Sequence, residues 1–258
     1  MRYRGAAKGH GVYGFHPLVK LGWLVAVSAG VFVLAHPLHM LVLLGALVGL
    51  MAWAGVRPRR DLRGSGVLLW MTLLLFGLQV VFWDEGQVVA HLLPWARRWP
   101  VTDGGLRRGI IVGGRFAVIV LSSQLFVLLT DPGALAYALM QAGLPYRYGF
   151  ALVTALRLVP VFEVEATTVY QAQLVRGVRY DAHALRRIYE LVRQFMFPML
   201  VSALHKVDAL AISMEGRQFG LYPKRTYLRQ SDLGRADWIA ILALSLYIAV
   251  TIYLRLVI

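Results

Sequence analysis

Five apolar runs, each close to the length that crosses a bilayer, constrain this chain more than any other feature. A helix needs about 20 consecutive apolar residues to cross the hydrocarbon core of a membrane. The runs cover residues 21–35, 38–56, 67–83, 110–129 and 237–258. Hydrophobic residues make up 59% of the chain, whereas a soluble domain is nearer half apolar. The sequence therefore predicts an all-α polytopic membrane protein with about five transmembrane helices.

Positive charge indicates how these spans are oriented. Four arginines lie within Arg57–Arg63, directly after the second run, and cytoplasmic loops of membrane proteins are enriched in Lys and Arg. We therefore expect the N-terminus on the cytoplasmic side, where its own basic residues also belong. That N-terminal stretch lacks the short apolar run and cleavage site of a signal peptide. The net charge of +14 would also suit nucleic acid, but the hydropathy favours a bilayer, so we expect no nucleic-acid partner.

One charge falls inside a predicted span. Arg115 lies in the fourth run, and a charge within the bilayer costs about 3 kcal/mol or more unless it faces protein or reaches the interface. Because it is five residues from the expected helix start, at residue 110, we expect its side chain to snorkel to the membrane surface.

Between the fourth and the last run, residues 144–220 predict two long helices. The first starts near Pro145 and ends at Val175-Arg176-Gly177, with Pro160 expected to kink it. The second starts near Ala184 and ends at Glu215-Gly216-Arg217, with apolar residues recurring every three or four positions on one face. We therefore predict three domains: a four-span membrane domain (1–130), a cytoplasmic coupling domain (131–233) and a C-terminal transmembrane helix (234–258).

Both long helices end in an arginine beside a glycine. A cation at a helix C-terminus is favoured by the helix dipole, which alone would explain Arg176 and Arg217. The repetition favours a second explanation. An exposed arginine can make a bidentate contact in an acidic groove of a partner, and a neighbouring glycine lets that partner's backbone approach.

No enzyme motif accompanies this pattern. The chain has no phosphate-cradling loop, no zinc-protease motif and no cysteine, so we expect no catalytic residue, cofactor or metal. An intramembrane enzyme stays open as an alternative, with His36, His39, Glu163 or Glu165 as its site residues. A stand-alone carrier is another, and its few mid-membrane polar residues are Gln79, Ser122, Ser123 and Gln124.

Several segments, in this order, resemble the transmembrane (T) component of energy-coupling factor (ECF) importers, which are ABC transporters. The matching segments are His16-Pro17-Leu18-Val19-Lys20-Leu21, Leu144-Pro145, Ala155-Leu156-Arg157-Leu158-Val159-Pro160, Gln171-Ala172-Gln173-Leu174-Val175-Arg176-Gly177 and Met214-Glu215-Gly216-Arg217-Gln218-Phe219-Gly220. The chain departs from the family pattern at four positions that matter here. His16 replaces an aspartate, Val175 and Gly216 replace alanines, and Gln218 replaces the glycine after the second arginine.

The resemblance implies a coupling subunit in a prokaryotic plasma membrane. Such a subunit has no catalysis of its own and transmits movement from two cytoplasmic ABC ATPases to a membrane-embedded, substrate-binding S component. Its cargo would be a vitamin, a vitamin precursor or a metal ion. Carried over by position, the ATPase-docking residues are Val175, Arg176, Gly177, Gly216, Arg217 and Gln218, and Arg157 and Pro160 have structural roles.

Overall fold

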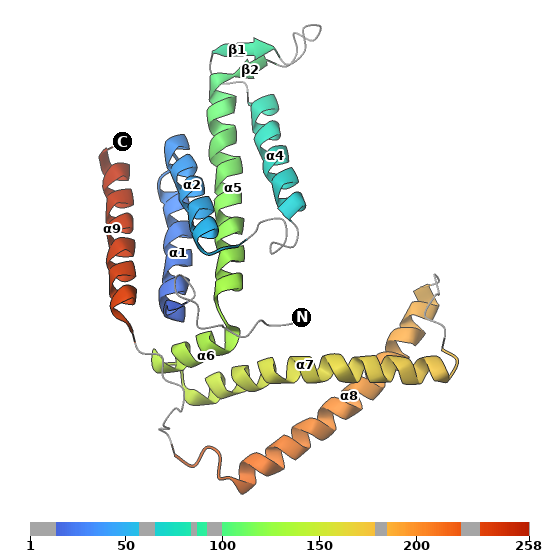
Figure 1. Cartoon of the computed structure of the whole chain (residues 1–258). Coiled ribbons are helices and arrows are strands. Elements are labelled where there is room, and N and C mark those ends of the chain that lie inside the picture. Colours follow the sequence, from blue (N-terminus) through green and yellow to red (C-terminus); the bar gives the residue numbers. More distant parts are fainter. Residues whose placement is uncertain are drawn as a thin grey trace. The chain divides into compact units, whose positions relative to one another are not determined.

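Helices account for nearly all of the regular structure in the computed structural model, which describes residues 14–56, 65–83, 87–91, 100–178, 185–222 and 233–257 (Figure 1). The helices are α1 (Pro17–Val33), α2 (Pro37–Trp53), α4 (Ser65–Phe82), α5 (Asp103–Leu129), α6 (Pro132–Gln141), α7 (Tyr146–Val175), α8 (Leu185–Gly216) and α9 (Arg235–Val257). The predicted spans correspond to α1, α2, α4, α5 and α9. The predicted all-α membrane fold is confirmed.

Length and apolar composition identify three described helical segments that could cross a bilayer. They are Asp103–Leu129, Tyr189–Gly216 and Arg235–Val257, while Pro17–Val33, Pro37–Trp53 and Gly66–Phe82 are shorter apolar helices. The second segment belongs to α8, which the sequence places in the cytoplasm. Its cytoplasmic position therefore stays a prediction.

The chain forms two compact units. One comprises Met1–Leu135 with Ser231–Ile258, and the other comprises Ala136–Gln230. Some segments lie outside the described residues. They are the basic residues before Gly14, the arginine-rich run Arg57–Arg63 and most of the segment between α8 and α9.

The core of the first unit lies between α1, α2 and α5. Val31 of α1, Met40 of α2 and the α5 residues Val118 and Leu125 are almost fully buried there. The opposite faces of α1 and α2 expose large apolar residues such as Phe32 and Leu41. Apolar residues all round a helix are expected where the solvent is lipid.

Helices α4 and α5 approach closely because α5 presents glycine every fourth residue. A Cβ atom at Gly105, Gly109 or Gly113 would lie 3.1–3.3 Å from a backbone carbonyl oxygen of α4 or of Trp83 just after it. Small residues at this spacing let two membrane helices pack backbone to backbone.

A short antiparallel hairpin precedes α5, and the sequence did not predict it. Its strands are β1 (Val88–His91) and β2 (Pro100–Thr102). The hydroxyl of Thr102 accepts from the Gly105 N–H at 3.1 Å and donates to the Trp83 carbonyl at 2.8 Å. This cap starts α5 at Asp103, seven residues before the predicted span at 110.

Arg115 therefore lies twelve residues from the start of α5. The expectation that its side chain snorkels to the membrane surface is wrong, because the guanidinium contacts α1 instead. Its guanidinium lies 4.8 Å from the centre of the Phe32 ring, and its Nη2 donates to the Val31 carbonyl at 3.4 Å. Val31 is in the last turn of α1, where carbonyl groups lack helical partners and a cation is favoured. The charge thus faces protein.

Polar contacts join α1, α5 and α9 at one end of this unit. The ammonium of Lys20 donates to the Leu129 carbonyl at 2.8 Å. The buried Asp237 carboxylate accepts from the backbone N–H of His16 at 2.7 Å and of Gly234 at 2.9 Å. His16 is the position where the resembled family carries aspartate, and here a carboxylate from α9 meets the start of α1.

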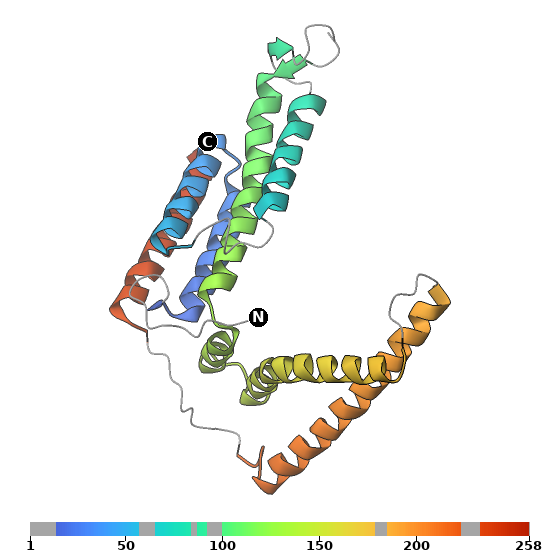
Figure 2. The ribbon, with the colours of Figure 1, turned by 45° about the vertical axis from the view of Figure 1, so that its right-hand side comes forward.

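The second unit contains α7 and α8, whose bounds confirm the two long helices predicted from the sequence. Both leave most side chains exposed: Gly149 and Gln173 are the buried residues of α7, and the described side chains of α8 include none that is buried. Helix α7 is continuous from Tyr146 to Val175 (Figure 2), and Pro160 lies inside it. Pro160 removes one backbone hydrogen bond without ending the helix.

Candidate functional site

The end of α7 is closed by a left-handed turn after Arg176. Gly177 has φ +82°, its N–H donates to the Leu174 carbonyl at 2.9 Å, and the Val178 N–H donates to the Gln173 carbonyl at 3.1 Å. These paired bonds form a Schellman motif with Arg176 at the C-cap. The arginine is exposed, and the preceding Val175 is 91% exposed.

The end of α8 repeats this geometry. Gln218 has φ +54° and its N–H donates to the Glu215 carbonyl at 2.9 Å, while the Phe219 N–H donates to the Met214 carbonyl at 2.9 Å. Arg217 therefore occupies the same position as Arg176, and it is also exposed. Neither guanidinium has a hydrogen-bond or ion-pair partner among the described residues. The repetition seen in the sequence is thus a repetition of backbone structure.

Gln218 adopts a conformation that glycine takes without strain. A left-handed backbone costs a residue with a Cβ roughly 1–2 kcal/mol. We expect Gln218→Gly to raise the free energy of unfolding by about 1 kcal/mol. Thermal unfolding of the purified chain in detergent measures this. Gln171→Gly, on an exposed turn inside α7, is the control and should destabilise by about 1 kcal/mol. A Gln218→Gly variant less stable than the parent would contradict the motif.

Helices α7 and α8 cross antiparallel and are joined by polar side chains. The carboxylate of Glu165 accepts from the Ser202 hydroxyl and the Lys206 ammonium. Eight residues further along α7, the side-chain amide of Gln173 donates to the Gln194 carbonyl at 3.1 Å. These contacts fix where the two helices cross, and so how far apart the two arginine ends lie.

The Glu165 carboxylate is the centre of this crossing. We expect Glu165→Gln to lower the free energy of unfolding by about 1 kcal/mol, because it removes the charge of a half-buried ion pair but keeps a hydrogen-bonding group. Glu163→Gln is the matched control, since this exposed side chain makes no such contact. Thermal unfolding of both variants in detergent measures the difference. Equal stability of the two would show that Glu165 does not brace the helices.

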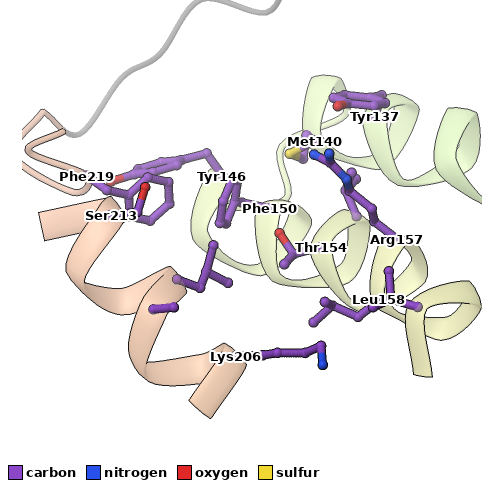
Figure 3. Close-up of a pocket in the computed structure, with 14 residues that line it drawn as sticks. Tyr137, Met140, Tyr146, Phe150, Thr154, Arg157, Leu158, Lys206, Ser213 and Phe219 are labelled. Atoms are coloured by element: carbon purple, nitrogen blue, oxygen red, sulfur yellow. The ribbon is translucent and has the colours of Figure 1, made fainter. Parts of the chain in front are cut away.

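An apolar groove of about 830 Å³ lies beside this crossing (Figure 3). Its walls come from α6, α7 and the second half of α8, and Phe219 closes one end by packing on Phe150 with ring centroids 4.5 Å apart. Arg157 extends toward Met140 in Figure 3 and makes no hydrogen bond or ion pair with the described residues. The structure therefore shows Arg157 on a groove wall, not in the brace between the helices.

The residues of the alternative functions make structural contacts within their own units. His39 lies in the first unit, where its ring meets the Leu34 carbonyl at 3.1 Å and the Tyr247 hydroxyl at 3.3 Å. Glu165 lies in the second unit and is paired with Lys206. Ser122 donates to the Ile119 carbonyl of its own helix at 3.0 Å. No group of three metal-binding side chains occurs within the described part of the chain.

Comparison with known proteins gives one consistent result. Residues 13–228 match the family model CbiQ, described as cobalt transport protein. The energy-coupling factor transporter transmembrane protein EcfT of Limosilactobacillus fermentum is 30% identical over 241 residues, which cover 87% of this chain and 84% of that protein. The EcfT protein of Bacillus subtilis is 25% identical over 95% of this chain and 94% of its own length.

Proposed function

This chain belongs to the family of CbiQ cobalt transport proteins and EcfT transmembrane proteins, and from that premise we propose that it couples two cytoplasmic ABC ATPases to a membrane-embedded S component. In this proposal the ATPases supply the energy and the S component captures the substrate. The chain itself moves, and it performs no catalysis. Its cargo is a vitamin, a vitamin precursor or a metal ion taken into the cell.

The paired helix ends carry this proposal. Two exposed arginines occupy the same capped position on two helices that brace each other. One docking end consists of Val175, Arg176 and Gly177, and the other of Gly216, Arg217 and Gln218. Each guanidinium can form two parallel hydrogen bonds with a carboxylate in an ATPase groove. Because the helices cross at Glu165, a change in spacing at these ends must change the angle between α7 and α8.

We propose that the S component contacts α7 and α8 near the groove. Exposed apolar side chains continue along both helices, including Val159, Val164, Leu204, Val207 and Ile212. Water disfavours such a surface, and lipid or an apolar partner would cover it. The structural roles of Arg157 and Pro160 belong to this proposal: Arg157 lines the groove, and Pro160 weakens the hydrogen bonding of α7 beside it.

The predicted domain limits and orientation complete the proposal. Residues 131–233 act as the coupling domain, residues 1–130 and 234–258 anchor it in the bilayer, and the N-terminus faces the cytoplasm. The arginine-rich run Arg57–Arg63 supports this orientation.

An activity assay separates this function from the enzyme and carrier alternatives. We expect the purified chain alone, in liposomes, to hydrolyse no ATP and to transport no substrate. Addition of ATPases of the energy-coupling class should give a stable complex that hydrolyses ATP, and uptake should also require an S component. Uptake by the chain alone would establish a carrier. Failure to bind any such ATPase would reject the coupling role.

A further inference from the structure

A second groove, which we call the α9 groove, lies in the first unit. It has a volume of about 380 Å³ and is lined by α1, α2 and α9. Its walls are formed by carbon atoms of residues such as Val19, Val27, Leu43, Leu50 and Ala243. The proposed coupling function uses none of these residues.

Side-chain size explains why the groove stays open. Helix α9 packs on α1, where a Cβ at Gly22 would lie 3.6 Å from Leu244 and a side chain at Gly30 would overlap the Tyr247 hydroxyl. Leu244 and Tyr247 of α9 line the groove where they pack on α1, and the other two α9 residues in its lining, Ala240 and Ala243, have small side chains. These methyl groups are too short to fill the space toward α2, which leaves an apolar slot beside a close helix pair.

The groove spans about one leaflet. It reaches from Phe15, just before α1, to Val27, twelve residues along, a distance of about 18 Å at the helical rise. Half of a bilayer's hydrocarbon core is about 15 Å thick. A single acyl chain of a lipid matches both the length and the apolar lining of the groove.

Positive charge gathers at one end of the groove. Lys20 lies there on α1, and Arg235 is the exposed first residue of α9. The carboxylate of Asp237, which attracts Lys20 electrostatically, accepts from two backbone N–H groups. Trp23 and Trp53 line the same end, and tryptophan is typical of the headgroup level of membranes.

We propose that the α9 groove binds an anionic phospholipid, with one acyl chain in the slot and the phosphate at the Lys20 and Arg235 end. The acyl chain would fill the space between α9 and α2 that Ala240 and Ala243 leave open. The cations would select an anionic headgroup over a zwitterionic one by electrostatic attraction. This inference is independent of the coupling function.

Native mass spectrometry of the full-length chain, released from detergent, tests the proposal. We expect phosphatidylglycerol to be retained about fivefold more than phosphatidylcholine of the same acyl chains. Ala243→Phe fills the slot and should reduce retained phosphatidylglycerol several-fold. Ala249→Phe, on an exposed part of the same helix outside the groove, should not. Arg235→Gln should reduce the preference for phosphatidylglycerol while leaving phosphatidylcholine retention unchanged.

Three results would overturn the proposal. They are equal retention of the two lipids, unchanged retention by Ala243→Phe, and full competition by glycerol phosphate, which would indicate an anion site without an acyl slot. Quenching of tryptophan fluorescence in the unmodified chain provides a test that needs no variant. Brominated phosphatidylglycerol should quench more than brominated phosphatidylcholine, because Trp23 and Trp53 line the groove. Equal quenching would contradict it.

Discussion

Replacing Arg176 and Arg217 together by alanine should release the ATPase subunits and abolish substrate uptake. Each guanidinium is exposed at the C-cap of its helix and is free of partners among the described residues. Truncating one member of a buried charge pair at an interface costs about 2 kcal/mol or more, so losing both docking contacts should weaken binding by several hundredfold or more. Copurification of the complex and uptake into liposomes measure the two effects.

Two controls separate docking from helix stability. Arg255→Ala removes an exposed arginine in the last turn of α9, in the first unit, and should leave binding unchanged. The Arg176→Lys/Arg217→Lys variant keeps the charge that favours the helix dipole but loses the bidentate geometry. We expect this variant to fold normally and still bind poorly. Normal binding and uptake by the alanine double variant would show that neither arginine docks.

Gly109→Leu should disrupt the first unit. A Cβ at Gly109 would lie 3.1 Å from the Phe76 carbonyl oxygen and 3.0 Å from a Phe76 ring carbon. The backbone of α4 cannot yield as a flexible side chain can, so a leucine here must push α4 away from α5. Overpacking costs about 1–3 kcal/mol or more. The yield of monodisperse protein in detergent and its unfolding temperature should both fall sharply.

Gly45→Leu is the matched control, because the same substitution in α2 meets no atom within 4 Å of the new Cβ. It gains the same helix propensity and apolar surface, and we expect stability equal to or above that of the parent. Similar losses in both variants would mean that leucine itself, not the α4–α5 contact, is harmful.

Sequence patterns predicted the helices because apolar length and apolar spacing are both local properties of the sequence. Apolar length defines a span, and the three-to-four-residue spacing defines the long helices. The start of α5 was missed because it depends on Thr102, whose hydroxyl binds Trp83, and on the hairpin before it. The wrong expectation for Arg115 had the same cause, because its depth was counted from residue 110 instead of Asp103. The contact of Asp237 with His16 joins residues 221 apart, which no local pattern reveals.

The candidate site was predicted in part. The arginine ends were visible as repeated short motifs. The left-handed conformation of Gln218 was not, because side chains other than glycine adopt it infrequently and its paired hydrogen bonds are seen only in the backbone. The ion pair of Glu165 with Lys206 links two helices, and only their crossing brings these residues together.

The distance between the two docking ends tests the proposed movement of α7 against α8 most directly. The chain has no cysteine, so Gln171→Cys and Ile212→Cys, both exposed and about one turn before the docking residues, place two spin labels without background. The distance between the two spin labels is measured by pulsed electron paramagnetic resonance in the complex with its ATPases. It is measured first without nucleotide and then with ATP under non-hydrolysing conditions. We predict a shorter distance with ATP, because closing ATPases draw together the arginines they hold. A distance that nucleotide leaves unchanged would contradict a coupling role for α7 and α8.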